Sequence, residues 1–260
     1  MKMAPPFSFC ILCLDENHVV LFQQSHGVRS RLKPGDFVLD LLKAQPDSER
    51  TILLLRHSKR NSFIGVPDHL RPGVEITPEG VLMAREFGES LLEIVPDRCL
   101  FLRHTIARRC RMTAESIGQG YSSGNQFLME EYPQVLGDPV VDMGRFIGLR
   151  EQYGWENLIR KWLDREIPDD VLQDPDLFSD NNVKNLLSLC ATGDRDLFVV
   201  VGHDVTLFPI VSRVFGRKLT TIEFLNGIVI SACETTAEIQ FANSEFSVRK
   251  KLNAGDRSGI

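Results

Sequence analysis

The sequence predicts an α/β fold, with a mostly parallel central sheet flanked by helices. Three short apolar runs support this prediction, at residues 51–55, 99–102 and 197–201. Short runs that are apolar throughout are typical of strands buried on both faces of a parallel sheet. Segments with the helical spacing of apolar residues follow these runs. This alternation of strands and helices along the chain indicates an α/β protein.

Residues 1–50 are expected to form a β-hairpin and a linker packed on the core. Residues 7–24 contain two apolar stretches around a polar turn, which is typical of a hairpin. A short helix is expected over 37–44, before a linker at 45–50. The hairpin would either extend the central sheet or pair with another chain. The core domain is expected to span residues 51–260.

Two helices are expected after the first two core strands. Thr77 is a typical N-cap residue, and Pro78 is a typical first helical residue. Apolar residues then recur at helical spacing until Pro96 ends the pattern. A second helix is expected over 107–118, soon after the strand at 99–102.

Residues 121–182 are expected to form an insertion that covers the active face of the domain. Gly, Pro, Asn and Asp are frequent there, and only residues 156–163 keep a helical pattern. We expect Trp155 and Trp162 to form a small core within this insertion rather than a surface on which a substrate stacks.

The chain after the insertion returns to regular spacing. Helices are expected over 182–190 and 205–215, and the run at 197–201 is the strongest strand signal in the sequence. Late strands are expected over 228–231 and 238–241.

Composition argues against several classes of function. A net charge of −5 and a pI of about 5.7 do not favour a nucleic-acid partner. No apolar run approaches the roughly 20 residues of a membrane span, and Asp15 and Glu16 interrupt the N-terminal apolar stretch, so we expect a cytoplasmic protein without a membrane partner. The 6 cysteines are too scattered for a disulfide framework, and Cys10 and Cys13 lack a second pair of zinc ligands. We therefore expect no metal and no cofactor.

Basic residues and histidines follow all three apolar runs. Because ligands bind outside the carboxyl ends of the strands in open α/β sheets, these side chains are expected at the ligand site. Guanidinium groups hold phosphoryl oxygens, and a neutral imidazole among them can attack phosphorus. The sequence therefore predicts a phosphate site. The residues concerned are Arg56, His57 and Arg60; Arg103, His104, Arg108 and Arg109; and His203 with Asp204.

These motifs resemble those of the histidine phosphatase superfamily. Arg56–Arg60 is similar to its Arg-His-x-x-Arg signature, and Thr105–Glu115 is similar to its Ser-x-x-x-Arg-Cys-x-x-Thr-Ala-Glu pattern. Ile76–Gly80 resembles the Leu-Thr-x-x-Gly of the family. Gly202–Asp204 resembles the His-Asp signature of its acid phosphatase branch, whereas the mutase branch usually has Gly-His-Gly.

The sequence departs from the family pattern at two positions, where Ser58 replaces a usual glycine and Thr105 a usual serine. A serine is small, and a threonine hydroxyl does the work of a serine hydroxyl, so we expect neither change to abolish activity. The resemblance covers residues 51–118 and 195–232, and it leaves out the N-terminal segment and the insertion.

The resemblance implies a phosphoglycerate mutase-like fold and a metal-independent phosphomonoesterase. His57 would attack phosphorus and form a phosphohistidine, and Asp204 would protonate the leaving oxygen and then activate water. A carboxyl donor implies an acid optimum, unless the leaving group is good or burial raises the pKa of that carboxyl. The phosphate-binding residues implied are Arg56, Arg60, Arg109 and His203.

Two other functions stay open from the sequence. A phosphomutase would use the same nucleophile, although Gly202–Asp204 argues against it. A catalytically inactive phosphate-binding or scaffolding domain would keep the arginines, but the intact His57 and Asp204 argue against it. Asp204 would also suit the start of the following helix, as a cap.

The substrate is the least constrained part of the prediction. A small-molecule or protein phosphomonoester is expected as the partner, with a sugar phosphate, a nucleotide and a phosphoprotein all open. We expect Arg108 and Arg111 at the surface or rim and His104 behind the phosphate site. Four acidic residues of the insertion would disfavour highly phosphorylated ligands if they faced the site: Glu130, Glu131, Asp138 and Asp142.

Overall fold

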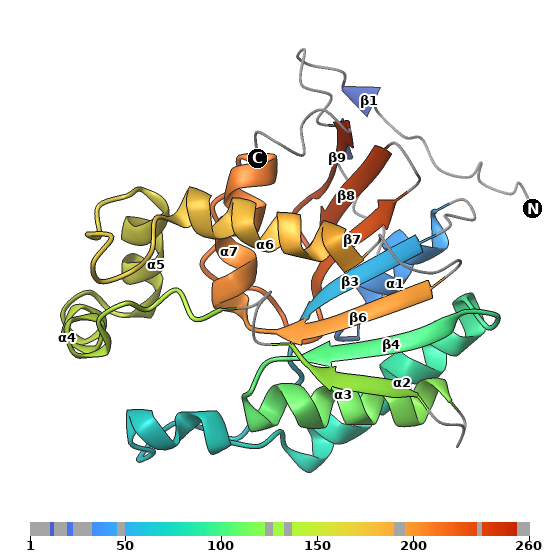
Figure 1. Ribbon diagram of the computed structural model, residues 1–260, viewed down its shortest axis with the longest axis horizontal. Coiled ribbons are helices and arrows are strands. Elements are labelled where there is room, and N and C mark those ends of the chain that lie inside the picture. The colour runs from blue at the N-terminus through green and yellow to red at the C-terminus, as the bar shows by residue number, and fades with distance from the viewer. Residues whose placement is uncertain are drawn as a thin grey trace, which may run out of the picture.

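A computed structural model describes residues 11–12, 20–22, 33–45, 50–122, 127–132, 137–189, 196–232 and 236–253 of the chain. These residues form one sheet of nine strands in the order β1-β2-β9-β8-β7-β3-β6-β4-β5 (Figure 1). The strands are β1 Ile11–Leu12, β2 Val20–Phe22, β3 Arg50–Arg56, β4 Cys99–His104, β5 Leu128–Glu131, β6 Asp196–Gly202, β7 Gly227–Ala232, β8 Thr236–Ala242 and β9 Ser247–Asn253.

The half of the sheet that carries the predicted site is parallel. β3 pairs in parallel with β6, β6 with β4, and β4 with β5. All three predicted core strands are present. The central residues of β3 and β6 are buried on both faces as expected, whereas β4 buries Leu100 and Leu102 and leaves Phe101 partly exposed. The predicted α/β class with a parallel central sheet is confirmed.

The other half of the sheet is antiparallel, with β7 paired to β3, β8 to β7 and β9 to β8. β7 and β8 correspond to the two late strands expected from the sequence. β9 was not predicted, because only Val248 and Leu252 are buried in it and three charged residues lie between them. That spacing gives no strict alternation of apolar and polar residues.

The N-terminal strands extend this antiparallel half. Ile11 of β1 lies opposite Phe22 of β2, and Val20 of β2 lies opposite Arg249 of β9. Of the two arrangements left open for the hairpin, the structure has the extended sheet. The other residues of the predicted hairpin at 7–24, and most of the linker at 45–50, lie outside the described residues.

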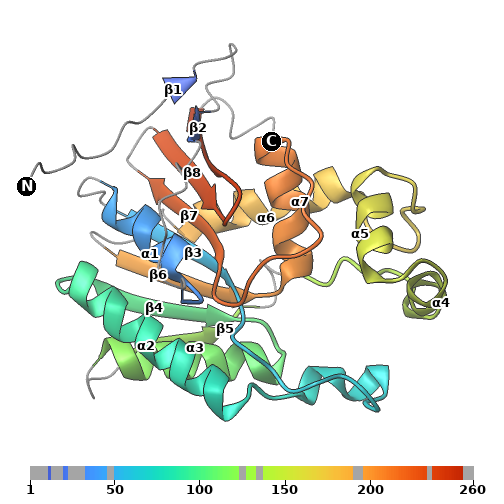
Figure 2. The same cartoon turned by 180° about the vertical axis from the view of Figure 1, so that it is seen from behind.

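Helices cover both faces of the sheet. α1, α2 and α3 lie on the face that is nearer the viewer in Figure 2, and α6 and α7 lie on the opposite face, seen in Figure 1. The helices are α1 Asp36–Lys43, the 3-10 helix η1 Asp68–Gly73, α2 Pro78–Ile94, α3 Arg108–Tyr121, α4 Met143–Tyr153, α5 Trp155–Leu163, α6 Pro175–Leu189 and α7 Asp204–Phe215.

The two faces of β3 show how the sequence builds these layers. Leu53 and Leu55 are fully buried in the cluster that includes α1, α2 and α3. Ile52 and Leu54, which alternate with them, are fully buried in the cluster that includes α5, α6 and α7. Successive side chains of a strand point to opposite faces, so an all-apolar strand requires a helical layer on each side.

The expected start of α2 is confirmed in detail. The Thr77 hydroxyl accepts a hydrogen bond from the Gly80 backbone N–H at 3.0 Å, and Pro78 is the first helical residue. This side-chain oxygen satisfies one of the N–H groups that have no partner within the first turn of a helix.

The insertion contains more regular structure than the sequence indicated. α5 matches the expected helix, but the prediction missed β5 and α4, and it placed the start of α6 too late, at Asn182 instead of Pro175. α6 begins earlier because the Asp174 carboxylate accepts from the Leu177 N–H at 2.8 Å, with proline as the first helical residue.

The interpretation of the two tryptophans was also wrong. Trp162 is fully buried in the main cluster beside the sheet, not in a separate core, and its indole N–H donates to the Gln173 carbonyl at 2.7 Å. Trp155 is 36% exposed and lines a cavity described below.

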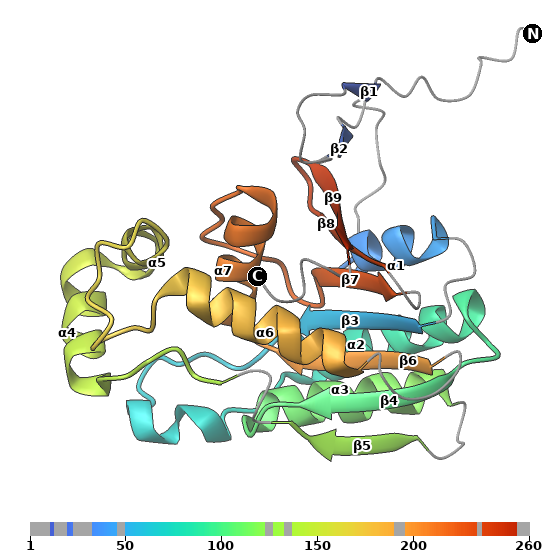
Figure 3. The same ribbon diagram turned by 45° about the horizontal axis from the view of Figure 1, so that its top comes forward.

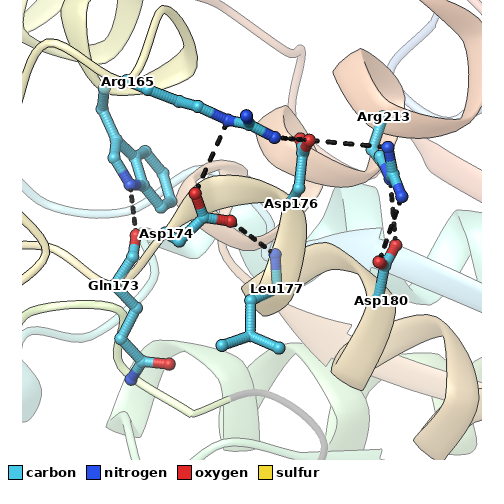
Figure 4. A network of polar contacts seen from close by, with 8 residues as sticks. Arg165, Gln173, Asp174, Asp176, Leu177, Asp180 and Arg213 are labelled. Atoms are coloured by element: carbon cyan, nitrogen blue, oxygen red, sulfur yellow. Dashed lines mark hydrogen bonds and ion pairs between the residues drawn. The ribbon is translucent and has the colours of Figure 1, made fainter.

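A network of ion pairs joins the insertion to α7 (Figure 4). Arg165, after α5, contacts Asp174 and Asp176 at the start of α6. Arg213 of α7 contacts Asp176 at 3.5 Å and binds Asp180 through two nitrogens, at 3.2 and 3.3 Å. α7 begins at Asp204, so this network holds the helix that carries a predicted catalytic residue.

Among the described residues, no helix is both long enough and apolar enough to cross a membrane.

We predict opposite effects for two Gly→Ala substitutions in helices. A Cβ at Gly120 of α3 would lie 2.1 Å from the Arg85 carbonyl oxygen of α2, whereas nothing lies within 4 Å of a Cβ at Gly148 of α4. Gly120→Ala is expected to lower the unfolding free energy by about 1–3 kcal/mol, because the helices must separate. Gly148→Ala is expected to raise it by up to about 1 kcal/mol, because alanine favours the helix. Urea unfolding measures both, and equal effects would contradict this account.

Candidate functional site

Three neighbouring strands bring the predicted site residues to one edge of the sheet. β3 ends at Arg56, opposite Gly202 of β6, and β4 lies on the other side of β6. The backbone N–H of His57 donates to the Gly202 carbonyl at 2.9 Å, which fixes His57 beside the residues that follow β6. The arrowheads of β4 and β5 point toward the side where α4 and α5 lie (Figure 3).

One cavity of about 640 Å³ lies at this edge. Parts of the insertion and of the segment after β3 contribute to its walls together with the strand ends. Four of the other basic residues after the strands do not line the cavity: His104 is buried, Arg108 and Arg111 are exposed, and Arg103 pairs with Glu130. All six residues predicted for catalysis or phosphate binding line it: Arg56, His57, Arg60, Arg109, His203 and Asp204.

The His57 imidazole is held as a neutral ring with one free nitrogen. Its Nδ1 lies 2.7 Å from the Ser58 carbonyl oxygen, which can only accept, so Nδ1 carries the proton and Nε2 keeps its lone pair. The side chain is buried, and burial, followed by repulsion from His203, lowers the pKa of His57 well below 6.5. Burial therefore favours the neutral ring, in which Nε2 keeps its lone pair.

His203 is also a neutral ring. Burial lowers its pKa to about 3, with further contributions from Arg109 and Arg56. Its Nδ1 lies 3.4 Å from an Arg109 nitrogen that can only donate, so Nδ1 accepts and Nε2–H donates to the Thr105 hydroxyl at 3.2 Å. The two imidazole rings meet edge to face, with centroids 5.5 Å apart.

Three arginines concentrate positive charge beside His57. Arg60 stacks on the Phe63 ring with its guanidinium carbon 3.4 Å from the ring centroid, and the Arg109 carbon lies 5.3 Å from the same centroid. Burial, followed by repulsion from Arg109 and Arg56, lowers the pKa of Arg60 to about 10. Burial also lowers the pKa of Arg109. These groups stay charged near neutrality, and an anion in the cavity would relieve their repulsion.

Arg56 is held in place from three sides. One nitrogen donates to the Ile222 carbonyl, another lies 3.1 Å from an Asp204 carboxylate oxygen, and the guanidinium lies over the Phe224 ring at 4.5 Å. The other Asp204 oxygen accepts from the Val205 N–H at 2.9 Å, at the start of α7. The N-cap residue of α7 is His203 and Asp204 is the first helical residue, so the capping role considered for Asp204 is wrong.

Ser58 and Thr105, the two departures from the family pattern, both make hydrogen bonds in the structure. Ser58 is fully buried, and its hydroxyl donates to the Gly80 carbonyl at 2.7 Å while its N–H donates to the Thr113 hydroxyl at 3.1 Å. Serine at this position therefore links the strand end to α2 and α3. Thr105 provides the hydroxyl that His203 binds.

Sequence reasoning missed several residues of the cavity. Arg71 of η1 and Arg150 of α4 add two guanidinium groups to its wall, and Phe63 and Trp155 add aromatic surface. Arg150 and Trp155 lie outside the residues that the family resemblance covers, and Phe63 and Arg71 lie within them but between the motifs, so no motif indicated any of the four. Among the four acidic residues considered above, only Asp138 lines the cavity.

The described residues contain no group of three or more His, Cys, Asp or Glu that could hold a metal ion. The positive charge around His57 comes from side chains of the protein. Arginines supply to a phosphoryl group the kind of electrostatic stabilisation that metal ions supply in other enzymes.

The fold matches solved structures of known enzymes. Phosphoglycerate mutase from Bacillus anthracis is 15% identical to this chain, with a TM-score of 0.52 over 72% of this chain and 89% of that one. The chain therefore shares the fold of that mutase. The segments after β3 and β6 lie side by side because these two strands pair in parallel and their ends adjoin.

Two further structures match at lower scores. A phosphoserine phosphatase from Entamoeba histolytica, solved with 3-phosphoglyceric acid, is 16% identical, with a TM-score of 0.46 over 70% of this chain and 90% of that one. A mycobacterial glucosyl-3-phosphoglycerate phosphatase is 13% identical, with a TM-score of 0.48 over 74% and 90% of the two chains. No protein-family model matches the sequence, and no curated protein matches it.

The neutral state of His203 predicts a loss of stability in acid. Its pKa is about 3 in the folded protein, against about 6.5 when unfolded. Below pH 6.5 the unfolded chain binds a proton that the folded chain does not, so stability falls as the pH falls from 6.5 toward 3. The expected contribution is about 1.4 kcal/mol per pH unit.

Urea unfolding between pH 7 and pH 4 tests this expectation. Carboxylates also titrate in acid, so the useful quantity is the difference between the native protein and His203→Gln, which lacks the imidazole. The unfolding free energy of the variant should fall less steeply as the pH is lowered. Identical slopes would mean that folding does not lower the pKa of His203.

Proposed function

We propose that the chain is a metal-independent phosphomonoesterase that acts through a phosphohistidine at His57. The observation that carries the proposal is one cavity that holds a neutral imidazole with a free Nε2, three arginines and a carboxyl group. Binding of phosphate alone would not need a buried imidazole with an available lone pair. The proposed activity is consistent with the fold, which phosphatase-type and mutase-type enzymes share.

In the first step, Nε2 of His57 attacks phosphorus in line with the ester oxygen. The N–P bond forms, the P–O ester bond breaks, and the electron pair of that bond leaves with the alcohol oxygen. Arg56, Arg60 and Arg109 bind the three other phosphoryl oxygens and stabilise their charge in the transition state. The Nε2–H of His203, which donates to the Thr105 hydroxyl in the free protein, would donate to one of these oxygens when the substrate is bound.

Asp204 supplies the proton that the leaving oxygen takes up. In the free protein its carboxylate pairs with Arg56. A bound phosphomonoester would also bind Arg56 and would place its ester oxygen beside the Asp204 carboxyl group. Substrate binding thus brings the leaving oxygen to the proton donor of the first step.

In the second step, the Asp204 carboxylate takes a proton from water. The water oxygen attacks phosphorus, and the N–P bond breaks with its electron pair returning to Nε2. Inorganic phosphate leaves, and both side chains recover their starting states.

We predict that His57→Asn abolishes turnover. Asparagine keeps a side-chain N–H for the Ser58 carbonyl but has no nucleophilic lone pair, so kcat for p-nitrophenyl phosphate is expected to fall at least about 1,000-fold. Hydrolysis is followed between about pH 4 and pH 8 in EDTA, so that bound metals do not contribute. Arg145→Gln is the matched control, since Arg145 is exposed on α4 and pairs with Asp170.

The effect of Asp204→Asn is predicted to depend on the leaving group. p-Nitrophenolate leaves without a proton, whereas an alkoxide needs one, so kcat should fall about 100-fold or more for glycerol phosphate and much less for p-nitrophenyl phosphate. Asparagine keeps an oxygen for the Val205 N–H, which preserves the start of α7. Equal losses with both substrates would show that Asp204 is not the proton donor.

The same assays separate the other functions. Native protein that binds phosphate but hydrolyses no monoester would indicate an inactive phosphate-binding or scaffolding domain. Transfer of the phosphoryl group to a second alcohol in preference to water would indicate a phosphomutase. The cytoplasmic location, and the absence of nucleic-acid and membrane partners, stay predictions from composition.

A further inference from the structure

The cavity holds more positive charge than one phosphoryl group uses. Five arginines and two aspartates line it. Arg56, Arg60 and Arg109 account for the oxygens of a transferred phosphoryl group. The remaining two, Arg71 and Arg150, have no role in the proposed chemistry at His57.

Arg71 and Arg150 form a fixed pair across two elements. Asp68 of η1 lies 2.6 Å from an Arg71 nitrogen, and its two oxygens lie 3.2 and 3.4 Å from two Arg150 nitrogens. One carboxylate therefore orients two guanidinium groups and leaves one net positive charge. We call Arg71 and Arg150, with Asp68 between them, the arginine pair.

The arginine pair lies next to the proposed phosphate site. The Arg71 guanidinium carbon is 5.2 Å from the centroid of Phe63, the ring on which Arg60 stacks. The Arg71 carbonyl accepts a hydrogen bond from Arg109 at 3.0 Å. A small molecule bound at His57 would therefore reach the arginine pair with its leaving group.

The wall beside the arginine pair suits an organic leaving group. Trp155 and Ile106 line the cavity with 36% and 67% of their surfaces exposed, and Pro72, the residue after Arg71, also lines it. The cavity thus offers apolar surface as well as a second positive charge. A phosphomonoester with no second charge would leave that positive charge without a partner.

We propose that the substrate is a small phosphomonoester whose leaving group carries a second anionic group, a carboxylate or a phosphate, bound by Arg71 and Arg150. This inference rests on the proposed function for the position of the phosphoryl group. It assigns the choice of substrate to η1 and α4, two segments outside the family motifs. Guanidinium groups bind both kinds of anion through paired N–H donors.

Binding of phosphonates, which cannot be hydrolysed at the P–C bond, tests the inference without requiring turnover. Calorimetry compares benzylphosphonate with its 4-carboxy derivative and with 1,4-xylylene diphosphonate. Native protein is expected to bind at least one of the two doubly anionic compounds about tenfold or more tightly than benzylphosphonate. The compound with the larger gain identifies a carboxylate or a phosphate as the second anion.

Variants assign the preference to the arginine pair. Arg150→Gln and Arg71→Gln should lose most of the preference for doubly anionic phosphonates over benzylphosphonate. Arg150→Lys should retain part of this preference, and Arg145→Gln on the same helix should keep it in full. If the pair only ties η1 to α4, Arg150→Gln would lower thermal stability and leave the preference unchanged.

A further comparison needs no variant. The 4-aminomethyl derivative, which carries a positive charge, should bind native protein more weakly than benzylphosphonate. Equal binding of the neutral and doubly anionic phosphonates by native protein would overturn the inference and leave the proposed function standing. Preference for the doubly anionic compounds without any turnover would leave the inference standing and overturn the proposed function.

Discussion

The parallel pairing of β3 with β6 is the constraint on which the site depends. It places Arg56 opposite Gly202, and the His57 N–H on the Gly202 carbonyl continues the pairing beyond the strands. A shift of one residue in this register would turn the side chains of β3 to the opposite faces of the sheet. Leu53 and Leu55 would then leave the layer formed with α1, α2 and α3, so the packing of the core and the position of the nucleophile are fixed together.

The site gathers groups that repel one another, and the surrounding structure holds them there. Three guanidinium groups lie beside two imidazoles that burial keeps neutral. In the free protein this charge is balanced only in part, chiefly by Asp204 on Arg56. Backbone carbonyls and aromatic rings orient the arginines without neutralising them, which leaves the positive charge available to an anionic ligand.

The insertion has two distinct effects on this site. Through Arg165 and its acidic partners it is fastened to α7, whose first residue is Asp204. Through Arg150 and Trp155 it contributes to the wall of the cavity. The strand ends of the core hold Arg56, His57 and His203, whereas the insertion and η1 line other parts of the same cavity.

The sequence alone determined the class of fold and identified six of the residues that line the cavity. Both were readable because they depend on local patterns: an all-apolar strand requires two covering layers, and motifs such as Arg56–Arg60 and Gly202–Asp204 lie directly at strand ends. Local patterns also located most helices, as at Thr77 and Pro78. α4 and β9 were missed because α4 carries two glycines and β9 buries only two side chains.

Only the tertiary structure decided which of the remaining charges face the substrate. Arg71 and Arg150 are far apart in the chain, and nothing in their own segments indicates that Asp68 joins them. The same holds for Trp155, which is exposed in the cavity, and Trp162, which is buried, although both belong to one short helix. Side chains that meet across elements depend on how those elements pack, and a local sequence pattern carries no information about that.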